Sequence, residues 1–172
     1  MEPQFLIFGH LTREYLLPAL GPARLDVAGG NLLYAAAGLR VWESGIGLVA
    51  RVGNDYPREW LNICMARGLD TSGIHILPRN MDVREFVAYT ETFEVSRINP
   101  ISHFARREMT FPKSLLGYQA SEDKRQPAEE SMLIVTDIPS DYLMARAALL
   151  CPMGLTAQTQ LIAGMKRGSI HT

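Results

Sequence analysis

The sequence predicts an α/β protein built around a mainly parallel β-sheet, and two observations lead to this prediction. Two apolar runs next to glycine, Phe5–Phe8 and Gly45–Val52, have the length and composition of buried strands. Further along the chain, each is followed by a segment with helix signals, Asn31–Trp42 and Pro57–Arg67. Strands and helices that alternate at this spacing are typical of βαβ units, in which the strands run parallel.

Both helices carry terminal signals. The first follows Gly29-Gly30, and its alanine and leucine residues favour a helix. The second has Pro57 in its first turn and Gly68 just beyond its end, which is the usual asymmetry of helix termini. Asp55 precedes this second helix, and we expect its carboxylate to cap the helix by accepting backbone N–H groups.

The middle of the chain has a different character. Residues 11–28 contain two prolines and a glycine between apolar residues, so we expect short edge strands or a loop. Residues 84–95 mix β-branched, aromatic and charged side chains, which favours a half-exposed antiparallel ribbon. Residues 119–131 are polar, and we expect them to form a surface connection.

The last part of the chain returns to core elements. We expect a buried strand over Met132–Thr136 that closes at Asp137, a helix from about Ser140, a short apolar run over Ala148–Cys151 and a helix over Thr156–Arg167. Residues 169–172 then have the composition of another strand. Because an α/β chain rarely finishes there, we expect this one to be truncated at its C-terminus.

Composition excludes several classes of protein. The 172 residues suffice for one core, and 47% hydrophobic with 20% charged residues is ordinary for a globular protein. A formal net charge of −1 argues against a nucleic-acid partner. No apolar run approaches the roughly 20 residues of a membrane span, and no signal peptide is recognisable. Cys64 and Cys151 are single and distant, so we expect reduced thiols in a cytoplasmic protein.

Common chemical motifs are absent or out of context. The G-x-G-x-x-A pattern over residues 45–50 lies inside a predicted strand, whereas a dinucleotide fingerprint follows a strand and opens a helix. The sequence contains neither a phosphate-binding P-loop nor a G-x-S-x-G elbow. The four histidines do not have the spacing of a zinc site, so we expect no metal ligands among them.

The paired glycines before the first helix admit two interpretations. One is a tight turn with helix capping, for which Gly30 or Asn31 alone would suffice. The other is a ligand site, because adjacent glycines leave the backbone N–H groups of a helix N-terminus open to a hydroxylated or anionic group. The residues themselves do not decide between these alternatives.

The order of several motifs resembles a known family. AGGN opens the first helix, GIGLVARVGND forms the next strand and turn, and ARGLDTSGI follows the second helix. Together they resemble the N-terminal half of the PfkB (ribokinase-like) carbohydrate kinases, clearly over residues 4–77 and more weakly through 137. The resemblance implies a three-layer α/β/α core with a small β lid from about 11–28 and 84–95. Residues 1–172 would then form a single, partial PfkB-like domain.

The same resemblance implies a substrate site. In similar kinases the paired glycines and an acidic side chain after the first strand hold hydroxyl groups of a sugar or nucleoside. Two residues depart from the family pattern: Glu14 stands where aspartate is usual, and Tyr34 stands where many members have asparagine. The substrate-binding residues implied in this chain are Glu14, Gly29, Gly30, Asn31 and Asp137.

The family uses ATP and Mg²⁺, with a catalytic aspartate in a G-A-G-D segment and an N-x-x-E motif. Neither motif occurs in this sequence, so no catalytic residue is assigned and most of the nucleotide site is expected to be missing. Two hypotheses follow: the substrate-binding half of a truncated or split kinase, and a non-catalytic sugar-binding or association module. Expected partners are a missing C-terminal half or a second copy bound through the lid, and we expect the isolated chain to be marginally stable or to self-associate.

Overall fold

The computed structural model describes residues 2–120, 132–166 and 168, and these divide into two compact units. We call the first the core unit; it comprises residues 2–11, 30–82 and the described residues from 132 onward. The second, called the β unit, comprises residues 12–29 and 83–120. Each unit contains its own sheet and its own hydrophobic cluster.

The core unit contains a four-stranded parallel sheet in the order β5-β4-β1-β8. Strand β1 is central, with Phe5 opposite Ile46 of β4 on one side and opposite Ala147 of β8 on the other. The prediction of a mainly parallel sheet is therefore confirmed for this unit. Its elements are β1 (Phe5–Phe8), α1 (Asn31–Leu39), β4 (Ile46–Gly53), α2 (Arg58–Ala66), β5 (Leu69–Leu77), β8 (Ala147–Leu150) and α4 (Leu155–Met165).

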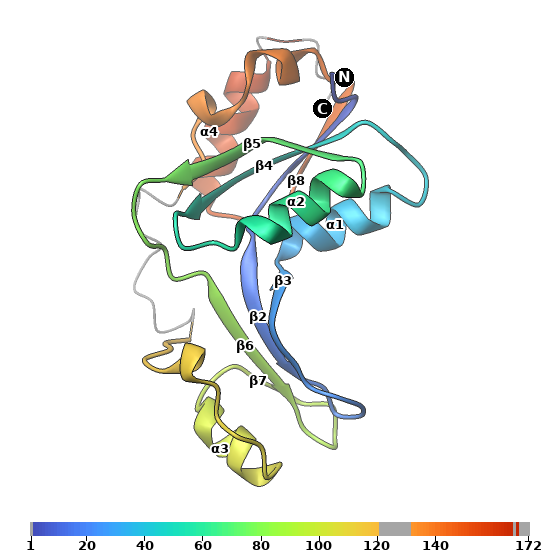
Figure 1. Cartoon of the computed structure of the whole chain (residues 1–172). Coiled ribbons are helices and arrows are strands. Elements are labelled where there is room, and N and C mark those ends of the chain that lie inside the picture. Colours follow the sequence, from blue (N-terminus) through green and yellow to red (C-terminus); the bar gives the residue numbers. More distant parts are fainter. Residues whose placement is uncertain (1, 121–131, 167, 169–172) are drawn as a thin grey trace. The chain divides into compact units, whose positions relative to one another are not determined.

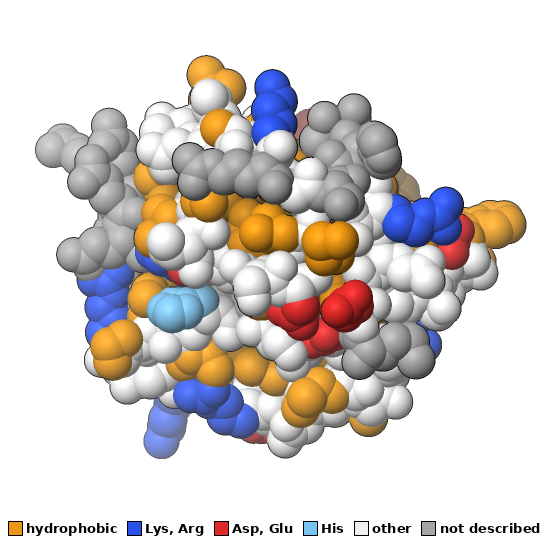
Figure 2. Space-filling model, turned by 90° about the horizontal axis from the view of Figure 1, so that it is seen from above, with side chains coloured by type: hydrophobic (Ala, Val, Ile, Leu, Met, Phe, Trp, Pro, Cys, Tyr) orange, Lys and Arg blue, Asp and Glu red, His pale blue; other side chains and the backbone are white. Residues whose placement is uncertain are grey.

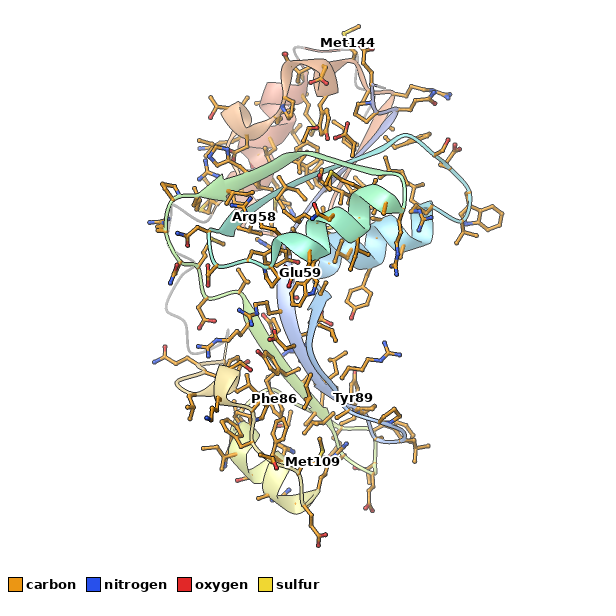
Figure 3. The ribbon with its side chains drawn as sticks, in the orientation of Figure 1. Arg58, Glu59, Phe86, Tyr89, Met109 and Met144 are labelled. Atoms are coloured by element: carbon orange, nitrogen blue, oxygen red, sulfur yellow. The ribbon has the colours of Figure 1, made fainter. Side chains whose placement is uncertain are left out.

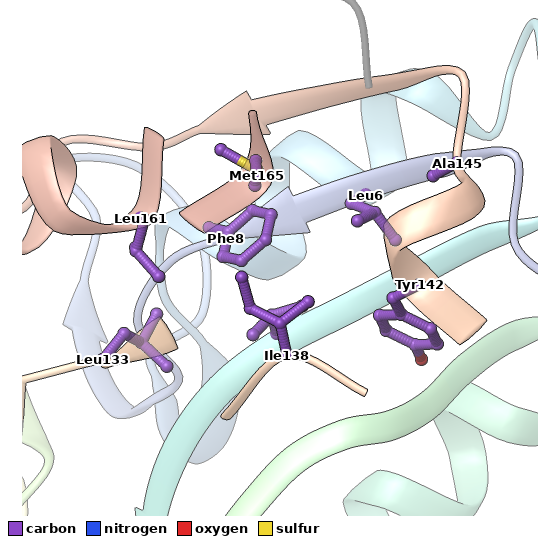
Figure 4. Packing of buried hydrophobic residues seen from close by; sticks show 9 residues of the cluster. Leu6, Phe8, Leu133, Ile138, Tyr142, Ala145, Leu161 and Met165 are labelled. Atoms are coloured by element: carbon purple, nitrogen blue, oxygen red, sulfur yellow. The ribbon is translucent and has the colours of Figure 1, made fainter. Parts of the chain in front are cut away.

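Helices cover both faces of this sheet. Figure 1 shows α1 and α2 on one face and α4 on the other. On the α4 side, Leu6 and Phe8 of β1 lie in one cluster with Leu161 and Met165 of the helix, as Figure 4 shows. This arrangement confirms the predicted three-layer α/β/α core. The remaining buried members of the cluster are Val49, Leu133, Ile138, Tyr142 and Ala145.

The β unit contains the order β3-β2-β6-β7. Its strands are β2 (Thr12–Leu17), β3 (Arg24–Gly29), β6 (Arg84–Tyr89) and β7 (Val95–Ser96), followed by the short helix α3 (Pro100–Arg106). The two segments expected to form a lid therefore supply all four strands, within one residue at their ends. β2 runs antiparallel to β3 but parallel to β6, and β6 runs antiparallel to β7.

Two expectations for the β unit need correction. Residues 11–28 form two short strands, which was one of the two expected alternatives, and β3 lies at the sheet edge as expected; β2, however, lies inside the sheet because both of its edges are paired. The ribbon over 84–95 is antiparallel only between β6 and β7, and the middle of β6 is buried. Phe86 of β6 is fully buried and contacts Phe104 of α3, while Tyr89 at the strand end is partly exposed; Figure 3 labels Phe86 and Tyr89.

A β-bulge shapes the β2–β3 pair. The register shifts between Glu14 and Tyr15, so that Asp26 is the additional residue on β3. Asp26 adopts a left-handed backbone with φ 55°. Its carboxylate accepts two hydrogen bonds from Arg13, at 2.9 Å from Nε and 2.7 Å from Nη2, and this contact with Arg13 lowers the pKa of the Asp26 carboxyl group.

The segment before β8 contradicts the sequence prediction. Met132–Thr136 is not a strand; a 3₁₀-helix spans Val135–Asp137 and another spans Ser140–Met144. A short apolar run does not reveal by itself whether it enters a ladder. Here Leu133 and Ile138 are buried in the cluster on the α4 side, and the Ile134 N–H donates to the Asp137 side chain.

The other elements agree with prediction in kind and differ at their ends. Helix α1 stops at Leu39, three residues before the predicted end, and α2 is one residue shorter at each end. Helix α4 begins one residue before its predicted start and ends two residues before its predicted end. Residues 121–131 and 169–172, expected as surface connection and strand, lie outside the described residues. Among the helices in the described part of the chain, none has the length and apolarity to cross a bilayer.

Candidate functional site

The carboxyl end of β1 is the topological switch point of the core sheet. β4 follows β1 in the chain and lies on one side of it, whereas β8 lies on the other side. The chain connections therefore run to opposite sides at the end of β1. In open α/β sheets, ligands bind in the crevice that forms where the connections diverge in this way. The residues at this place are Gly9 and His10 after β1, Cys151 and Pro152 after β8, and Gly30 and Asn31 at the start of α1.

Gly30 sets the direction in which α1 begins. It is the N-cap residue, with φ 102° and ψ 157°, a conformation that residues with a Cβ atom rarely adopt. No side chain caps the helix; the Gly30 carbonyl accepts the N–H groups of Leu33 and Tyr34 at 3.1 and 3.2 Å. The glycine at this position is thus required by backbone geometry, which supports the turn interpretation without excluding the ligand-site interpretation.

Asn31 joins three segments at the switch point. Its Oδ1 accepts the His10 N–H at 2.7 Å, and its Nδ2 donates to the Pro152 carbonyl at 2.9 Å. The side chain therefore connects the end of β1 to the end of β8. A carboxamide has two acceptor and two donor positions, so these bonds leave capacity for a ligand hydroxyl.

Small residues allow this close approach. A methyl group at Gly9 would lie 2.6 Å from Asn31 Oδ1 and 3.2 Å from the Cys151 Cβ atom. The Cys151 thiol is buried and donates to the Asn31 carbonyl at 3.7 Å. Burial raises the pKa of this thiol, so Cys151 remains protonated and is a packing residue here.

Glu14 and Gly29 meet within the β unit. Glu14 lies on β2 and is only 7% exposed, with the Thr12 hydroxyl donating to its Oε1 at 3.3 Å. A Cβ atom at Gly29 would overlap the Glu14 carboxyl group. Of the two glycines in the motif, Gly29 therefore makes room for the acidic side chain, whereas Gly30 makes the turn.

Asp137 is engaged elsewhere. Its Oδ2 accepts Arg51 Nε at 2.7 Å and its Oδ1 accepts Arg51 Nη2 at 2.9 Å, while the Ile134 N–H also donates to Oδ2 at 2.9 Å. The prediction that Asp137 closes a strand is wrong, because Asp137 lies in a 3₁₀-helix. The sequence contained one signal for this pair: Arg51 interrupts the apolar strand β4, and a cation in such a strand needs an anionic partner.

The expected cap at Asp55 is also wrong. The N-cap of α2 is Pro57, without a side-chain hydrogen bond. Asp55 Oδ1 instead accepts the Met81 N–H at 2.9 Å, and the Asn54 N–H donates to the Arg79 carbonyl at 2.9 Å. A Cβ atom at Gly53 would overlap these groups. The turn after β4 is therefore fastened to the segment after β5 rather than to the helix.

The described residues offer no preformed cluster of metal-ligating side chains. Within residues 2–120, 132–166 and 168, no three His, Cys, Asp or Glu side chains gather in a way that could hold a metal ion. Asp137, an acidic residue assigned to the site from the sequence, is bound to Arg51 through both oxygens.

Comparison with known proteins places this architecture. The chain matches a PfkB protein from Polaromonas sp. with a TM-score of 0.61 and 18% identity, over 98% of this chain and 54% of that one. It matches a fructokinase from Vibrio cholerae O395, solved with fructose, ADP and calcium ion, with a TM-score of 0.54 and 17% identity, over 98% of this chain and 49% of that one. The chain has the ribokinase-like fold of the PfkB kinases.

Sequence comparison agrees with the PfkB-like fold. A cytidine kinase from Thermococcus kodakarensis is 33% identical over 73 residues, which cover 42% of this chain and 26% of the relative. No family model matches the sequence. The resemblance inferred from the motif order is therefore confirmed at the level of the fold. This PfkB-like chain spans about a quarter of the curated relative and about half of the solved structures.

Proposed function

We propose that this chain forms the substrate-binding part of a PfkB-type kinase, which phosphorylates a hydroxyl group of a sugar or nucleoside with ATP. The observation that carries the proposal is the position of Gly30 and Asn31 at the switch point of the core sheet. Ligand sites of open α/β sheets occur at such points. The fold is shared with a fructokinase whose structure was solved with fructose and ADP.

Each proposed residue has a chemical reason. Asn31 keeps one donor and one acceptor position for hydroxyl groups after its bonds to His10 and Pro152. Glu14 supplies a carboxylate, and hydrogen bonds from hydroxyl groups to a carboxylate are among the stronger contacts to a neutral ligand. Gly29 is needed beside that carboxylate, and Gly30 shapes the backbone at the helix start. Asp137 contributes less directly, because Arg51 already binds both of its oxygens.

We further propose that the chain does not catalyse phosphoryl transfer by itself. Phosphoryl transfer depends almost entirely on positioning and on stabilising charge. The sequence contains no G-A-G-D segment for the base and the anion hole, and the described residues contain no metal-ligand group. ATP and Mg²⁺ would then be bound mainly by residues outside this sequence.

The partner in this proposal is a complementary polypeptide or a second copy. Hydrophobic side chains are exposed in several places on the face shown in Figure 2, among polar and charged ones. Leu149 on the edge strand β8 and Leu155 at the start of α4 are both exposed. An edge strand with exposed apolar side chains favours association with another chain. A cytoplasmic location is part of the same proposal, since Cys64 and Cys151 are both free thiols.

A binding and turnover assay tests the proposal. The purified chain is titrated calorimetrically with ribose, fructose, cytidine and inosine, and is then incubated with ATP, Mg²⁺ and each ligand. We expect binding of at least one ligand without turnover above background. If a folded chain binds none of them at millimolar concentration, the substrate-binding role is wrong. If it phosphorylates one of them alone, the incompleteness is wrong.

The alternative is a non-catalytic sugar-binding or association module. It is favoured by the absence of the catalytic motifs from the sequence. Mixing this chain with the C-terminal half of a PfkB kinase separates the two hypotheses. Recovery of turnover supports the split kinase, whereas ligand binding without any recovery supports the module.

A further inference from the structure

The segment that the turn after β4 holds is the connection between the two units. Residues 78–82, called the connecting segment, follow the end of β5 and are the last residues of the core unit before the β unit begins at Val83. The turn binds this segment at two points, Arg79 through its carbonyl and Met81 through its N–H. The connecting segment is therefore fixed to the core unit by hydrogen bonds outside any sheet or helix.

The other end of the connection is fixed as well. The Val83 carbonyl accepts the Arg13 N–H at 2.9 Å, and β6 begins at the next residue, Arg84. Met81, which Asp55 holds, is thus only two residues from a point that is fixed within the β unit. The bond between Asp55 and Met81 consequently determines how firmly the core unit holds the chain where it enters β6.

Gly53 is required by this contact rather than by the turn itself. Its backbone is not among the left-handed glycines of the described residues, so its conformation is open to other residue types. A Cβ atom at Gly53, however, would lie 2.5 Å from the Met81 nitrogen and 2.8 Å from the Arg79 carbonyl oxygen. The glycine therefore provides the space that lets the turn approach the connecting segment.

The contact is built so that it can open by itself. Asp55 and Arg79 are exposed, and a surface hydrogen bond of this kind can break without disturbing a buried core. We propose that the turn Gly53–Asp55 is a conformational latch, in which the Asp55 carboxylate holds the connecting segment on the core unit and its release makes that segment flexible. This role accounts for the G-N-D motif, which the expected helix cap did not explain, and it does not depend on the proposed function.

Limited digestion with trypsin tests the latch, because a protease cleaves a folded chain where a segment opens locally. Cleavage after Arg79 reports on the connecting segment, and cleavage after Arg67, exposed at the end of α2, is the reference within the core unit. Mass spectrometry distinguishes the two products. Asp55→Ala removes the acceptor and should accelerate cleavage after Arg79 by roughly 3- to 10-fold, the usual net value of one hydrogen bond, and leave cleavage after Arg67 unchanged.

Two further variants separate the latch from a general loss of stability. Asp55→Asn keeps an oxygen that can accept the Met81 N–H, so its digestion should resemble that of the parent chain. Asp70→Ala is the matched control. Asp70 Oδ1 also accepts a backbone N–H, from Ser72 at 2.8 Å, but at the start of β5 rather than beyond its end. Cleavage after Arg79 should therefore be the same in Asp70→Ala as in the parent chain.

Amide hydrogen exchange of the parent chain provides a test without any substitution. If the latch opens locally, exchange of the Met81 amide should respond weakly to low urea concentrations, whereas the amide of Ile7 in β1 should respond steeply because it waits for global unfolding. An equal urea dependence for both amides would overturn the inference. Unchanged cleavage after Arg79 in Asp55→Ala, or equal acceleration there and after Arg67, would overturn it too.

Discussion

Arg51 and Asp137 are 86 residues apart in the sequence and form a bidentate ion pair, with 2.7 Å between Nε and Oδ2 and 2.9 Å between Nη2 and Oδ1. Their side chains are only 10% and 3% exposed. The pair connects strand β4 of the core sheet to the 3₁₀-helix before β8. Because the two charges are shielded from water, neither can be removed without leaving the other uncompensated.

Breaking this pair should destabilise the core unit strongly. Arg51→Met leaves a buried carboxylate without its cation, and we expect a loss of about 3–5 kcal/mol in the free energy of unfolding. The double variant Arg51→Met/Asp137→Leu removes both charges and should recover most of that loss. Urea denaturation measures both. A double variant as unstable as the single one would show that the cost comes from packing rather than from the unpaired charge.

The Asn31 side chain should contribute to stability independently of any ligand. Asn31→Ala removes the acceptor of the His10 N–H and the donor to the Pro152 carbonyl. We expect a loss of about 1–3 kcal/mol, because two hydrogen bonds disappear together. Asn31→Asp keeps the acceptor but cannot donate when ionised, so the stability of this variant should lie between that of the parent chain and that of Asn31→Ala. The midpoint of urea unfolding at pH 7 checks this order, which a purely ligand-binding role would not produce.

Gly29 should tolerate a methyl group only when Glu14 is shortened. Gly29→Ala brings a Cβ atom into the Glu14 carboxyl group, and such overpacking costs about 1–3 kcal/mol. In the Glu14→Ala background the same substitution should be nearly neutral. Gly38→Ala is the matched control: Gly38 lies within α1 with open space around its Cα, so alanine there should stabilise by about 0.5–1 kcal/mol. Thermal melts of the parent chain, of Gly29→Ala, of Glu14→Ala and of the double variant give the coupling between Gly29 and Glu14.

His103 should make the stability of the β unit depend on pH. Desolvation, followed by the charges of Arg106 and Arg107, lowers the pKa of His103 below its ordinary value. Its Nε2 lies 3.0 Å from the Ser96 hydroxyl oxygen. The folded state therefore binds this proton less readily than the unfolded state, so stability should fall as the pH drops from about 6.5 through the folded-state pKa.

The His103→Gln variant tests this dependence. It removes the titrating group, and its unfolding free energy should change less between pH 7 and pH 5 than that of the parent chain. Parallel pH profiles for the two proteins would assign the acid sensitivity to other groups.

The parts of the fold that depend on local sequence were predictable. The apolar run Phe5–Phe8 is β1 at the same bounds, and Gly68, just beyond α2, adopts the left-handed φ of 81° expected after a helix. The strand predicted over Met132–Thr136 was wrong because an apolar run of five residues can pack into a cluster as well as into a ladder. Nothing within that run reveals which of the two occurs.

The candidate site was predictable in its residues but not in their contacts. The AGGN motif located the start of α1 and implied a role for Asn31, yet the partners of that side chain, His10 and Pro152, are 21 and 121 residues away. The Arg51–Asp137 pair is equally non-local. The prediction of a helix cap at Asp55 failed because its partner is also distant in the sequence. A carboxylate before a helix often caps it, but here the Asp55 carboxylate accepts the Met81 N–H instead.

The placement of β1 between β4 and β8 has a consequence for how the chain acquires its structure on the ribosome. β1 emerges before β4, and Ile46–Gly53 can pair with one of its edges soon afterwards. The opposite edge pairs with Ala147–Leu150, so this side of a hydrophobic strand stays unpaired until that much later segment has been synthesised. Chaperones that shield nascent chains would find their target there, and sheet completion is intrinsically slow because it waits for this distant pairing.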